Sequence, residues 1–474
     1  MRMDWKKLIT FERLGDTTAP KDRTKIDARN EFERDIDRII FSSEFRRLQD
    51  KTQVFPIPKS DFVHTRLTHS LEVAAVGRSL GKLGGKIIKA KEDKEVLEQF
   101  RSGHFGNIVA AACLAHDIGN PPIGHSGEDA FRRFFKNQEK RLKDVFNLTQ
   151  AEISDLTTFE GNASGFRILT NDHPSGRPGG LRLTYSTLAA FSKYPKQSGK
   201  VVANKLGSKI SDRVSQKEKK FGFFQREQEI FKEVADRNGL IRLSDEHDSW
   251  CRHPLAFLVE AADTACYSCI DIEDGYHLGY VSYDHLLSIM EPLAGKVLDN
   301  DPCDFQNEIN AIKDENEKVG YLRSRALNNI VNLCIMSFEK NYELIMTGEF
   351  DSELTDSLTR CQAEFDQLVD FNSSNLYNTR KGVQIEIAGY KILEGLLEFF
   401  LEAIENSYDA DKEHEKRRSK KILGLLPEYL RPTSNVADSY FNILKVCDFV
   451  SRSTDSYAID IFKKLNGEKF PVID

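Results

Sequence analysis

Apolar residues recur at steps of three and four along most of the chain, and this periodicity narrows the possible folds more than any other feature. It runs through residues 70–84, 107–115, 254–270, 325–338, 386–404 and 439–450. Such spacing places apolar side chains on one face of an α-helix. Alternating patterns typical of strands are few, and the stretch 52–58 contains prolines that exclude a central strand. The sequence therefore predicts a mainly α fold with a few short strands.

The length of 474 residues allows several domains, and we expect three parts. Residues 1–40 form an N-terminal arm, and residues 41–290 form a helical domain that holds the chemistry. Residues 291–474 form a C-terminal helical region packed on that domain. Lysine, serine and glutamine are frequent near residues 195–220, which predicts a mobile surface loop there.

Composition and charge exclude several classes of protein. Charged residues make up 30% of the chain and hydrophobic residues 40%, which is typical of a globular protein. The net charge of -7 argues against a chain that coats nucleic acid by bulk charge. No apolar stretch is long enough to span a bilayer and no signal peptide is visible, so we expect a cytoplasmic protein without membrane contact. Cys266 and Cys269 lie in a helical pattern, which favours buried core residues over a zinc or redox site.

The stretch AHDIGNPPIGHSGEDAF, residues 115–131, places histidines and carboxylates directly after an apolar helical segment. His116 and Asp117 end the helix before a turn rich in glycine and proline. Burying a carboxylate costs free energy unless a cation or hydrogen bonds compensate it. The pair alone favours a helix end whose Asp117 is solvated.

Two further segments supply residues of the same type. His69 lies in the first turn of a helix for which Thr68 is the predicted N-cap. Asp263 lies within an apolar helix, and Asp263, Tyr267 and Asp271 follow one another at four-residue steps, so they share a face. Two imidazoles and two carboxylates suit a divalent ion of intermediate softness: Mn²⁺ first, then Fe²⁺, Ni²⁺ or Zn²⁺, with Mg²⁺ less favoured because it prefers oxygen ligands.

These residues, in this order, resemble the HD-domain metal phosphohydrolases, whose pattern H…HD…D would be His69, His116, Asp117 and Asp263 here. Longer segments are similar to the bacterial dGTP triphosphohydrolases. They are residues 33–56, 64–78, 116–131, 159–169, 183–195, 219–231 and 253–275, and in the C-terminal third only 447–458. The resemblance implies an HD-domain helical core with additional C-terminal helices. It also implies an enzyme that hydrolyses dGTP, or dNTPs more broadly, to deoxynucleoside and inorganic triphosphate by water attack at the α-phosphorus.

The resemblance also assigns roles to single residues. His125 would be the catalytic histidine and Glu128 the carboxylate that orients it; independently, a His–Glu pair is a sound acid–base device near neutral pH. We expect Ser126 to cap the short helix that carries them.

The sugar and phosphate sites also come from the resemblance. Gln53 and Asp271 would hold the sugar 3′-hydroxyl, and Tyr267 would pack beneath the deoxyribose, leaving no room for a 2′-hydroxyl. Arg66, Lys193 and Tyr194 would contact the phosphates, and the negative charge of a triphosphate requires such cations.

Alternative functions remain open at this point. One is another HD phosphohydrolase that acts on a nucleoside monophosphate, a cyclic dinucleotide or a guanosine tetraphosphate alarmone. Another is a nucleotide-sensing or single-stranded DNA-binding regulator, with lysines of 196–220 forming a groove. The resemblance further implies a homo-oligomer, a hexamer or another closed ring. Base preference, the native metal and effector nucleotides are not readable from the residues.

Overall fold

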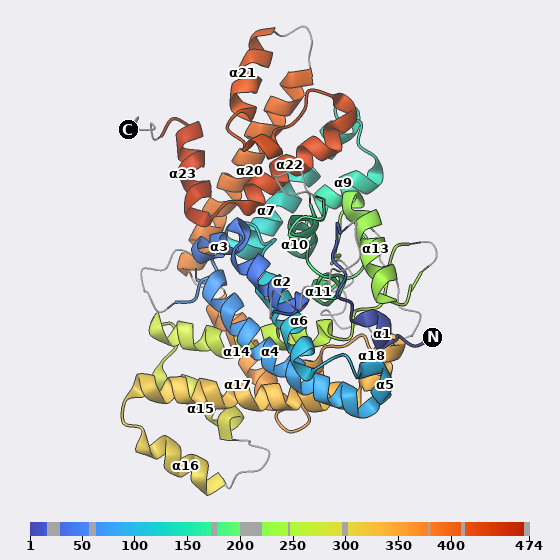
Figure 1. The fold of residues 1–474 in the computed structure, drawn as a ribbon. Coiled ribbons are helices and arrows are strands. Elements are labelled where there is room, and N and C mark those ends of the chain that lie inside the picture. Colours follow the sequence, from blue (N-terminus) through green and yellow to red (C-terminus); the bar gives the residue numbers. More distant parts are fainter. Residues whose placement is uncertain are drawn as a thin grey trace.

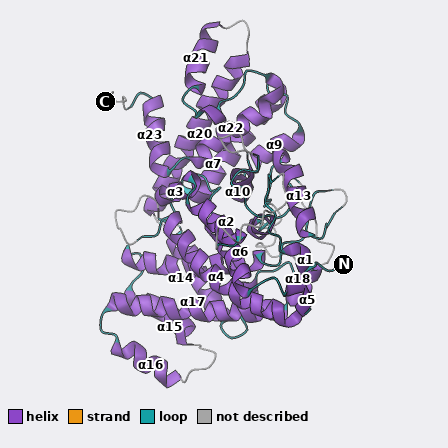
Figure 2. Cartoon of the chain, viewed as in Figure 1, coloured by secondary structure: helices purple, strands orange, loops and turns teal. Residues whose placement is uncertain are grey.

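The computed structural model describes residues 1–16, 29–55, 63–171, 178–199, 220–244, 247–295, 302–377, 380–408 and 413–468. Within these ranges every regular element is a helix, as Figures 1 and 2 show. The predicted mainly α fold is confirmed. In place of the expected short strands, the described residues pair only in isolated bridges such as Thr52 with Thr65.

The helices fall into three groups along the chain. The first group is α1 (Trp5–Leu8), α2 (Glu31–Ile40) and α3 (Ser43–Arg47). The second is α4 (Arg66–Lys91), α5 (Lys94–Leu97), α6 (Ser102–Ala115), α7 (Gly124–Asn137), α8 (Glu139–Asp144), α9 (Gln150–Thr157), α10 (Gly161–Thr170), α11 (Tyr185–Phe191), α13 (Gln228–Asn238) and α14 (Ala256–His277). The third is α15 (Tyr283–Gly295), α16 (Pro302–Ala311), α17 (Glu315–Lys340), α18 (Tyr342–Thr347), α19 (Gln362–Phe371), α20 (Arg380–Tyr408), α21 (Glu413–Leu423), α22 (Ser439–Arg452) and α23 (Asp455–Leu465).

Helices α4 and α6 pack closely in antiparallel directions. Small residues on α4 allow this approach: a Cβ on Gly81 would lie 2.8 Å from the Cα of Gly106, and one on Gly77 would touch the Cys113 sulfur. Almost every residue of α6 is buried, so this helix lies at the centre of the molecule. The antiparallel packing brings the start of α4, with His69, to the end of α6, with His116.

Helix α14 crosses α4 and α6 and completes the frame of the site. Its buried positions include Cys266 and Cys269, whose thiols form no disulfide among the described residues. Burial raises the pKa of both thiols, so the interpretation of this pair as core residues agrees with the structure.

The helix starts differ from two sequence predictions. The N-cap of α4 is Thr65, and Thr68 is its partner in a capping box, because the helix begins three residues earlier than predicted. Helix α7 begins at Gly124, after Ile123 in a left-handed conformation, so Ser126 lies inside the first turn and does not cap it. The double proline at 121–122 sets this earlier start.

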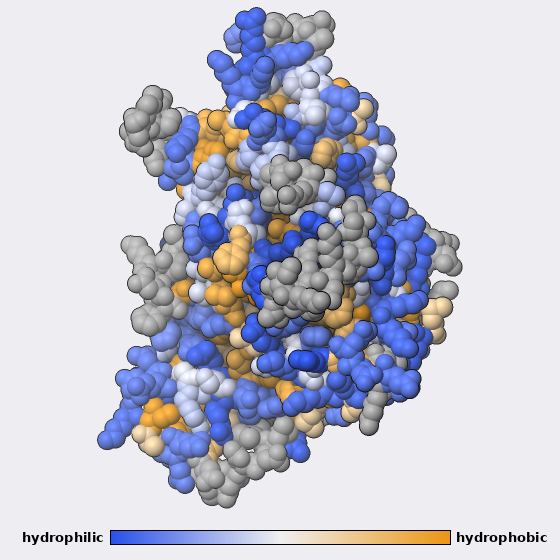
Figure 3. All heavy atoms as spheres, in the orientation of Figure 1, coloured by the Kyte–Doolittle hydropathy of each residue, from blue (hydrophilic) through white to orange (hydrophobic). Residues whose placement is uncertain are grey.

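The buried apolar side chains form two clusters. The first is built around α4, α6, α14 and α17. The second joins α7, α8 and α9 to α20, α22 and α23, so the C-terminal helices share a core with the central group. Figure 1 shows α20–α23 together at one end of the molecule, and Figure 3 shows that the projecting α21 is covered by hydrophilic side chains.

Other predicted features are only partly covered. Most of the loop expected near 195–220 lies outside the described residues, which stop at 199 and resume at 220. At the N-terminus Trp5 is fully buried, and its indole N–H donates to the Tyr342 hydroxyl at 2.7 Å. In the part of the chain that the structure describes, no helix is both long and apolar enough to cross a membrane.

Candidate active site

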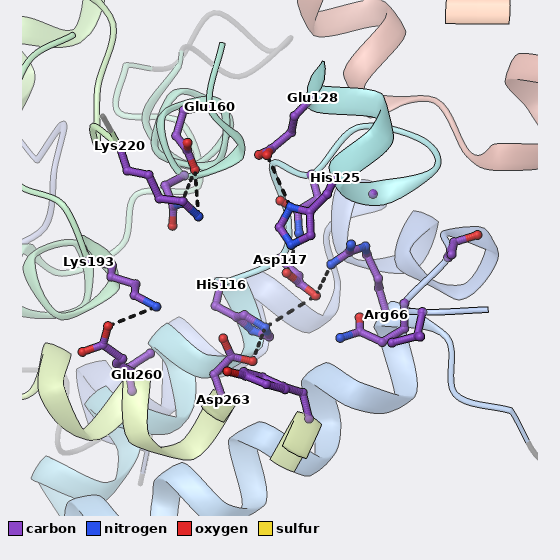
Figure 4. Close-up of a pocket in the computed structure, with 18 of the residues that line it drawn as sticks. Arg66, His116, Asp117, His125, Glu128, Glu160, Lys193, Lys220, Glu260 and Asp263 are labelled. Atoms are coloured by element: carbon purple, nitrogen blue, oxygen red, sulfur yellow. Dashed lines mark hydrogen bonds and ion pairs between the residues drawn. The ribbon is translucent and has the colours of Figure 1, made fainter. Parts of the chain in front are cut away.

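A cavity of about 510 Å³ opens where α14 faces the turn between α6 and α7. Its walls come from distant parts of the chain: the residues near Gln53, the 116–128 turn and α14, together with Arg66, residues of 160–162 and 190–194, and Lys220. Tyr377 and Glu386 are added from the C-terminal group. The volume falls in the range of small-molecule sites. Figure 4 shows charged side chains directed into it from several helices.

Four predicted ligands lie together, and three of them, His116, Asp117 and Asp263, line this cavity. The ligand atoms of His69, His116 and Asp117 all lie within 4.8 Å of one another. Asp263 Oδ1 lies 3.0 Å from His69 Nε2 and 3.4 Å from His116 Nε2. His116 Nε2 is also 3.5 Å from Asp117 Oδ2. Three segments far apart in sequence therefore bring two imidazoles and two carboxylates around one point.

The surroundings of this cluster fit a cation. His116 Nε2 is buried and makes no hydrogen bond within the described residues. Burial alone would lower the pKa of His116, but the carboxylates of Asp117 and Asp263 raise it to about 9. Despite burial, the neighbouring imidazoles hold the pKa of Asp263 well below its usual range. The cluster thus favours positive charge at the point where its ligand atoms meet, which is the condition for binding a metal ion.

Neighbouring side chains hold Asp117 in place. The Arg66 guanidinium donates through Nη1 to Asp117 Oδ2 at 2.7 Å, and the Asn120 amide donates to Oδ1. His116 is fixed in the same way, since its Nδ1 lies 2.6 Å from the Cys113 carbonyl oxygen and its Nε2 faces the cluster. Such outer contacts orient metal ligands and set the histidine tautomer.

His125 and Glu128 lie across the cavity from α14, next to Asp117 (Figure 4). His125 is 86% exposed in its side chain, and its Nδ1 is 3.4 Å from Glu128 Oε2. Glu128 is buried and also accepts from the Gly161 N–H at 2.7 Å and from Arg132 at 3.2 Å. Burial would raise the pKa of Glu128, but His125 and Arg132 bring it down to about 2. The carboxylate is therefore ionised and can hold one ring nitrogen of the histidine.

One end of the cavity carries groups suited to a sugar. Gln53, Tyr267 and Asp271 all line it, and Gln53 Oε1 is buried without a hydrogen-bond partner in the described residues. Burial raises the pKa of Asp271 to about 7, and the Tyr377 hydroxyl donates to its Oδ2 at 2.6 Å. An unsatisfied amide oxygen beside a carboxyl group can accept a hydrogen bond from a ligand hydroxyl.

The other end carries cations. Lys193 Nζ lies 3.1 Å from Glu260 Oε1, and both Lys193 and Lys220 lie 5.7 Å from the centre of the Tyr194 ring. Lys220 is also 4.0 Å from Glu160. Arg66, by contrast, is engaged with Asp117, and its buried Nε has no partner within the described ranges. Two lysines and a guanidinium facing one cavity can bind a polyanion.

Sequence reasoning missed several wall residues. Lys220 and Glu160 lie in segments that the sequence had singled out, 219–231 and 159–169, so a signal for them existed. Tyr377 and Glu386 come from a region without any such signal, and only the packing of the C-terminal helices places them in the wall.

Comparison with known proteins gives results that agree with this geometry. The family model of the HD domain matches residues 66–158. The chain is 38% identical to the deoxyguanosinetriphosphate triphosphohydrolase-like protein of Synechocystis, over 98% of this chain and 99% of the relative. It is 36% identical to the protein of the same name from Pseudomonas aeruginosa, over 99% and 100%. It is 28% identical to the deoxyguanosinetriphosphate triphosphohydrolase of Klebsiella pneumoniae, over 98% and 99%.

Proposed function

The chain belongs to the deoxyguanosinetriphosphate triphosphohydrolase family of HD-domain phosphohydrolases, and from this premise we propose that it hydrolyses dGTP, and other dNTPs more slowly, to deoxynucleoside and inorganic triphosphate. The observation that carries the proposal is the continuity of one cavity. The His–Asp cluster, a His–Glu pair, a sugar-sized polar end and a lysine end all border it. A nucleotide with three phosphates needs all four.

His69, His116, Asp117 and Asp263 are the residues that we propose to hold a divalent ion, most favourably Mn²⁺, with Mg²⁺, Ni²⁺, Fe²⁺ and Zn²⁺ as alternatives. An ion in this position would place positive charge beside the α-phosphate and would make a bound water molecule more acidic. Arg66 and Asn120 support Asp117 from behind, so this carboxylate keeps its direction when substrate enters.

The remaining chemistry falls to His125 and Glu128. Hydrolysis forms a bond from a water oxygen to the α-phosphorus and breaks the bond to the sugar O5′, which must gain a proton. Ionised Glu128 holds His125 through Nδ1, and the other ring nitrogen is then available to move a proton to the leaving oxygen or from the attacking water. Their separation of 3.4 Å is long, as is common before substrate binds.

Binding is distributed along the cavity. Lys193, Lys220 and Tyr194 contact the phosphates, while Arg66 keeps free donors beside Asp117. Gln53 and Asp271 hold the 3′-hydroxyl, and the rings of Tyr267 and Tyr377 close the space that a 2′-hydroxyl would need.

Glu386 supports a preference for guanine. Among the four bases, guanine offers two adjacent donors, N1–H and the N2 amino group, and one carboxylate accepts both. Glu386 of α20 is half-buried and lines the cavity. A carboxylate here would leave the other bases with fewer hydrogen bonds.

The deciding experiment incubates the protein with each of the four dNTPs and four NTPs in the presence of Mn²⁺, and separates the inorganic products. We expect tripolyphosphate, with the highest rate for dGTP and little turnover of ribonucleotides. Pyrophosphate or orthophosphate as the product would instead favour a different HD phosphohydrolase. Absence of any turnover with Mn²⁺, and on repetition with Mg²⁺, Ni²⁺, Fe²⁺ and Zn²⁺, would favour a nucleotide-sensing regulator.

Two expectations about partners stay predictions. The lysines of 196–220 lie mostly outside the described residues, so single-stranded DNA binding is tested by titration at low and high salt; absence of binding at low salt would exclude it. The mass of the protein in solution, measured by light scattering as it elutes from a size-exclusion column, tests whether it forms a hexamer or another closed ring. The mass of a monomer would exclude both.

A further inference from the structure

A single carboxylate from the C-terminal part, that of Asp455, contacts two segments of the cavity wall. Asp455 is the first residue of α23 and is 3% exposed. Its Oδ2 accepts from the Thr52 N–H at 2.9 Å and from the Thr52 hydroxyl at 2.5 Å. Its Oδ1 accepts from the Ile123 N–H at 2.9 Å. Both oxygens are therefore occupied by groups from the central part of the chain.

The two segments held in this way carry proposed functional residues. Thr52 precedes Gln53, whose buried amide oxygen faces the sugar end. Ile123 immediately precedes α7, and His125 and Glu128 lie in the first turns of that helix. The position of Asp455 thus connects a proposed binding residue to the proposed catalytic pair.

Ile123 needs such support because of its backbone. It has φ of 63°, a left-handed conformation that a β-branched residue adopts only under constraint from its surroundings. Its side chain also packs against α20, where a Cβ on Gly389 would lie 2.5 Å from Ile123 Cδ1. The hydrogen bond to Asp455 fixes the N–H of this constrained residue.

A second contact links the same three segments. The Lys51 ammonium group donates to the Asn120 carbonyl at 2.6 Å and to the Ser451 carbonyl at 2.7 Å. Asn120 in turn donates through its side chain to Asp117. The end of α22 and the start of α23 therefore contact the 51–52 segment through Lys51 and Thr52. The start of α23 contacts the 120–123 turn through Ile123, and Lys51 joins the 51–52 segment to that turn.

We propose that Asp455 is a positioning residue for hydrolysis: its carboxylate sets the 52–53 segment and the 123–128 turn relative to each other, and so places Gln53 and His125 on opposite sides of one substrate. The proposal rests on the proposed function for its catalytic consequence, while the geometric part stands on these hydrogen bonds. It also gives a role to 447–458, a C-terminal segment that is similar to the family.

Asp455→Asn tests the proposal, because an asparagine side chain has only one acceptor oxygen, whereas Thr52 and Ile123 each present an N–H donor to this position. We expect kcat to fall about 10- to 100-fold, since displacement of a catalytic group by about 1 Å has effects of this size. Manganese affinity, measured by electron paramagnetic resonance of free Mn²⁺, should change less than about twofold, because the four proposed ligands are untouched. In a His125→Ala background the same substitution should cost little further kcat, because the binding residue Gln53 is then the only proposed functional residue left for Asp455 to position.

Asp448→Asn is the matched control. Asp448 is also 3% exposed and lies in the neighbouring helix α22, but its oxygens accept from Arg167 at 3.0 and 3.1 Å, away from the 52–53 and 123–128 segments. We expect a lower unfolding midpoint with kcat of the folded protein unchanged. A loss of kcat in Asp455→Asn that is no larger than in this control, or that is equal with and without His125, overturns the proposal.

Hydrogen exchange separates this proposal from the proposed function. Asp455→Asn should speed amide exchange at 51–55 and 121–128, and Asp448→Asn should not. If the wild-type protein hydrolyses no dNTP while this pattern is observed, the proposed function is wrong and the positioning stands; unchanged exchange overturns the positioning even in an active enzyme. Should Asp455→Asn fail to fold, Thr52→Val removes only the hydroxyl bond, and we expect a several-fold kcat loss with the same dependence on His125.

Discussion

At the scale of single residues, we assign metal binding and proton transfer to different residues. A measurement of rate alone would not distinguish the loss of one from the loss of the other. Asp117 belongs to the proposed ligand set, whereas Glu128 lies across the cavity and holds His125. Asp117→Ala should therefore lose both Mn²⁺ binding and turnover. Glu128→Gln should bind Mn²⁺ normally while kcat falls about 10²- to 10⁴-fold.

The measurement pairs Mn²⁺ titration with kcat for both variants. Lys136→Gln on the outer face of α7 is a suitable control, since Lys136 is exposed and lies outside the main cavity. Normal turnover in Asp117→Ala, or loss of Mn²⁺ binding in Glu128→Gln, would contradict the proposed division of roles.

The sequence indicated most of the candidate site residues, but it did not indicate the contacts that these residues make with one another. His116, Asp117 and Asp263 stood out because charged side chains interrupted apolar helices, which is a local signal. Arg66 donates to Asp117, a contact that depends on how α4 packs beside the 116–120 turn, while its expected contact with phosphate stays a prediction. Tyr377 reaches Asp271 across 106 positions of sequence, and no local pattern marks such a residue.

At the scale of elements, the turn after α6 depends on contact with α10. A Cβ on Gly119 would lie 2.1 Å from the Gly165 nitrogen and 2.2 Å from the Gly161 oxygen, both backbone atoms. Gly119→Ala must therefore push α10 away, and we expect the free energy of unfolding to fall by at least about 2 kcal/mol. Turnover should fall as well, because the Gly161 N–H donates to Glu128.

Gly103→Ala provides the matched comparison within α6. A Cβ there has nothing within 4 Å, so only helix propensity changes, and stability should rise by up to about 1 kcal/mol. Urea unfolding of the two variants measures both effects. Equal stability in the two variants would show that α10 can shift without cost.

The segment just before α14 contains a histidine that the fold keeps neutral. His253 is fully buried; its Nδ1 accepts from the Leu255 N–H at 3.1 Å and its Nε2 lies 3.0 Å from the Leu8 carbonyl oxygen. Burial lowers the pKa of His253 to about 4. The unfolded chain therefore binds the proton first, and the stability present above pH 6.5 is lost as pH falls towards 4.

For wild-type protein we expect the free energy of unfolding to fall by about 2 kcal/mol more between pH 7 and pH 5 than for His253→Gln. Urea unfolding at the two pH values measures this difference. His414→Gln, at an exposed site on α21, should retain the wild-type dependence. A dependence on pH that is the same in all three proteins would mean that His253 does not titrate with unfolding.

Element type was predictable here, and element ends were less so. The periodicity of apolar residues is a property of each helix by itself, so α4, α6, α14, α17, α20 and α22 were expected where they occur. The start of α4 at Arg66 depends on which threonine caps it, and the start of α7 at Gly124 depends on the left-handed Ile123; no spacing rule indicates either.

At the scale of the whole molecule, the second apolar cluster determines whether the C-terminal region unfolds together with the central group or separately from it. Phe400 of α20 is fully buried and lies 5.4 Å from Phe449, ring centre to ring centre. Phe400→Ala should cost about 3–5 kcal/mol of unfolding free energy. Phe41→Ala, at a side chain that is 78% exposed, should change it by less than about 0.5 kcal/mol.

The same experiment tests the expected three-part division of the chain. Because α7–α9 and α20–α23 share one core, Mn²⁺ binding and helix content should be lost together in urea, and at lower urea in Phe400→Ala. Retention of Mn²⁺ after loss of the C-terminal helices would show independent domains. The sequence could not predict whether the C-terminal helices form a separate domain. Apolar periodicity indicates which face of a helix is buried, but not which other helix covers that face.

The hydrogen bond from Ile123 to Asp455 also has a consequence for how the protein is made. The ribosome adds Asp455 332 residues after Ile123, so a nascent chain carries the whole His–Asp cluster long before the partner of Ile123 exists. Proteolytic removal of α23 would return the finished protein to that same immature state. Any activity should therefore appear late in translation, once α23 has been added to the chain.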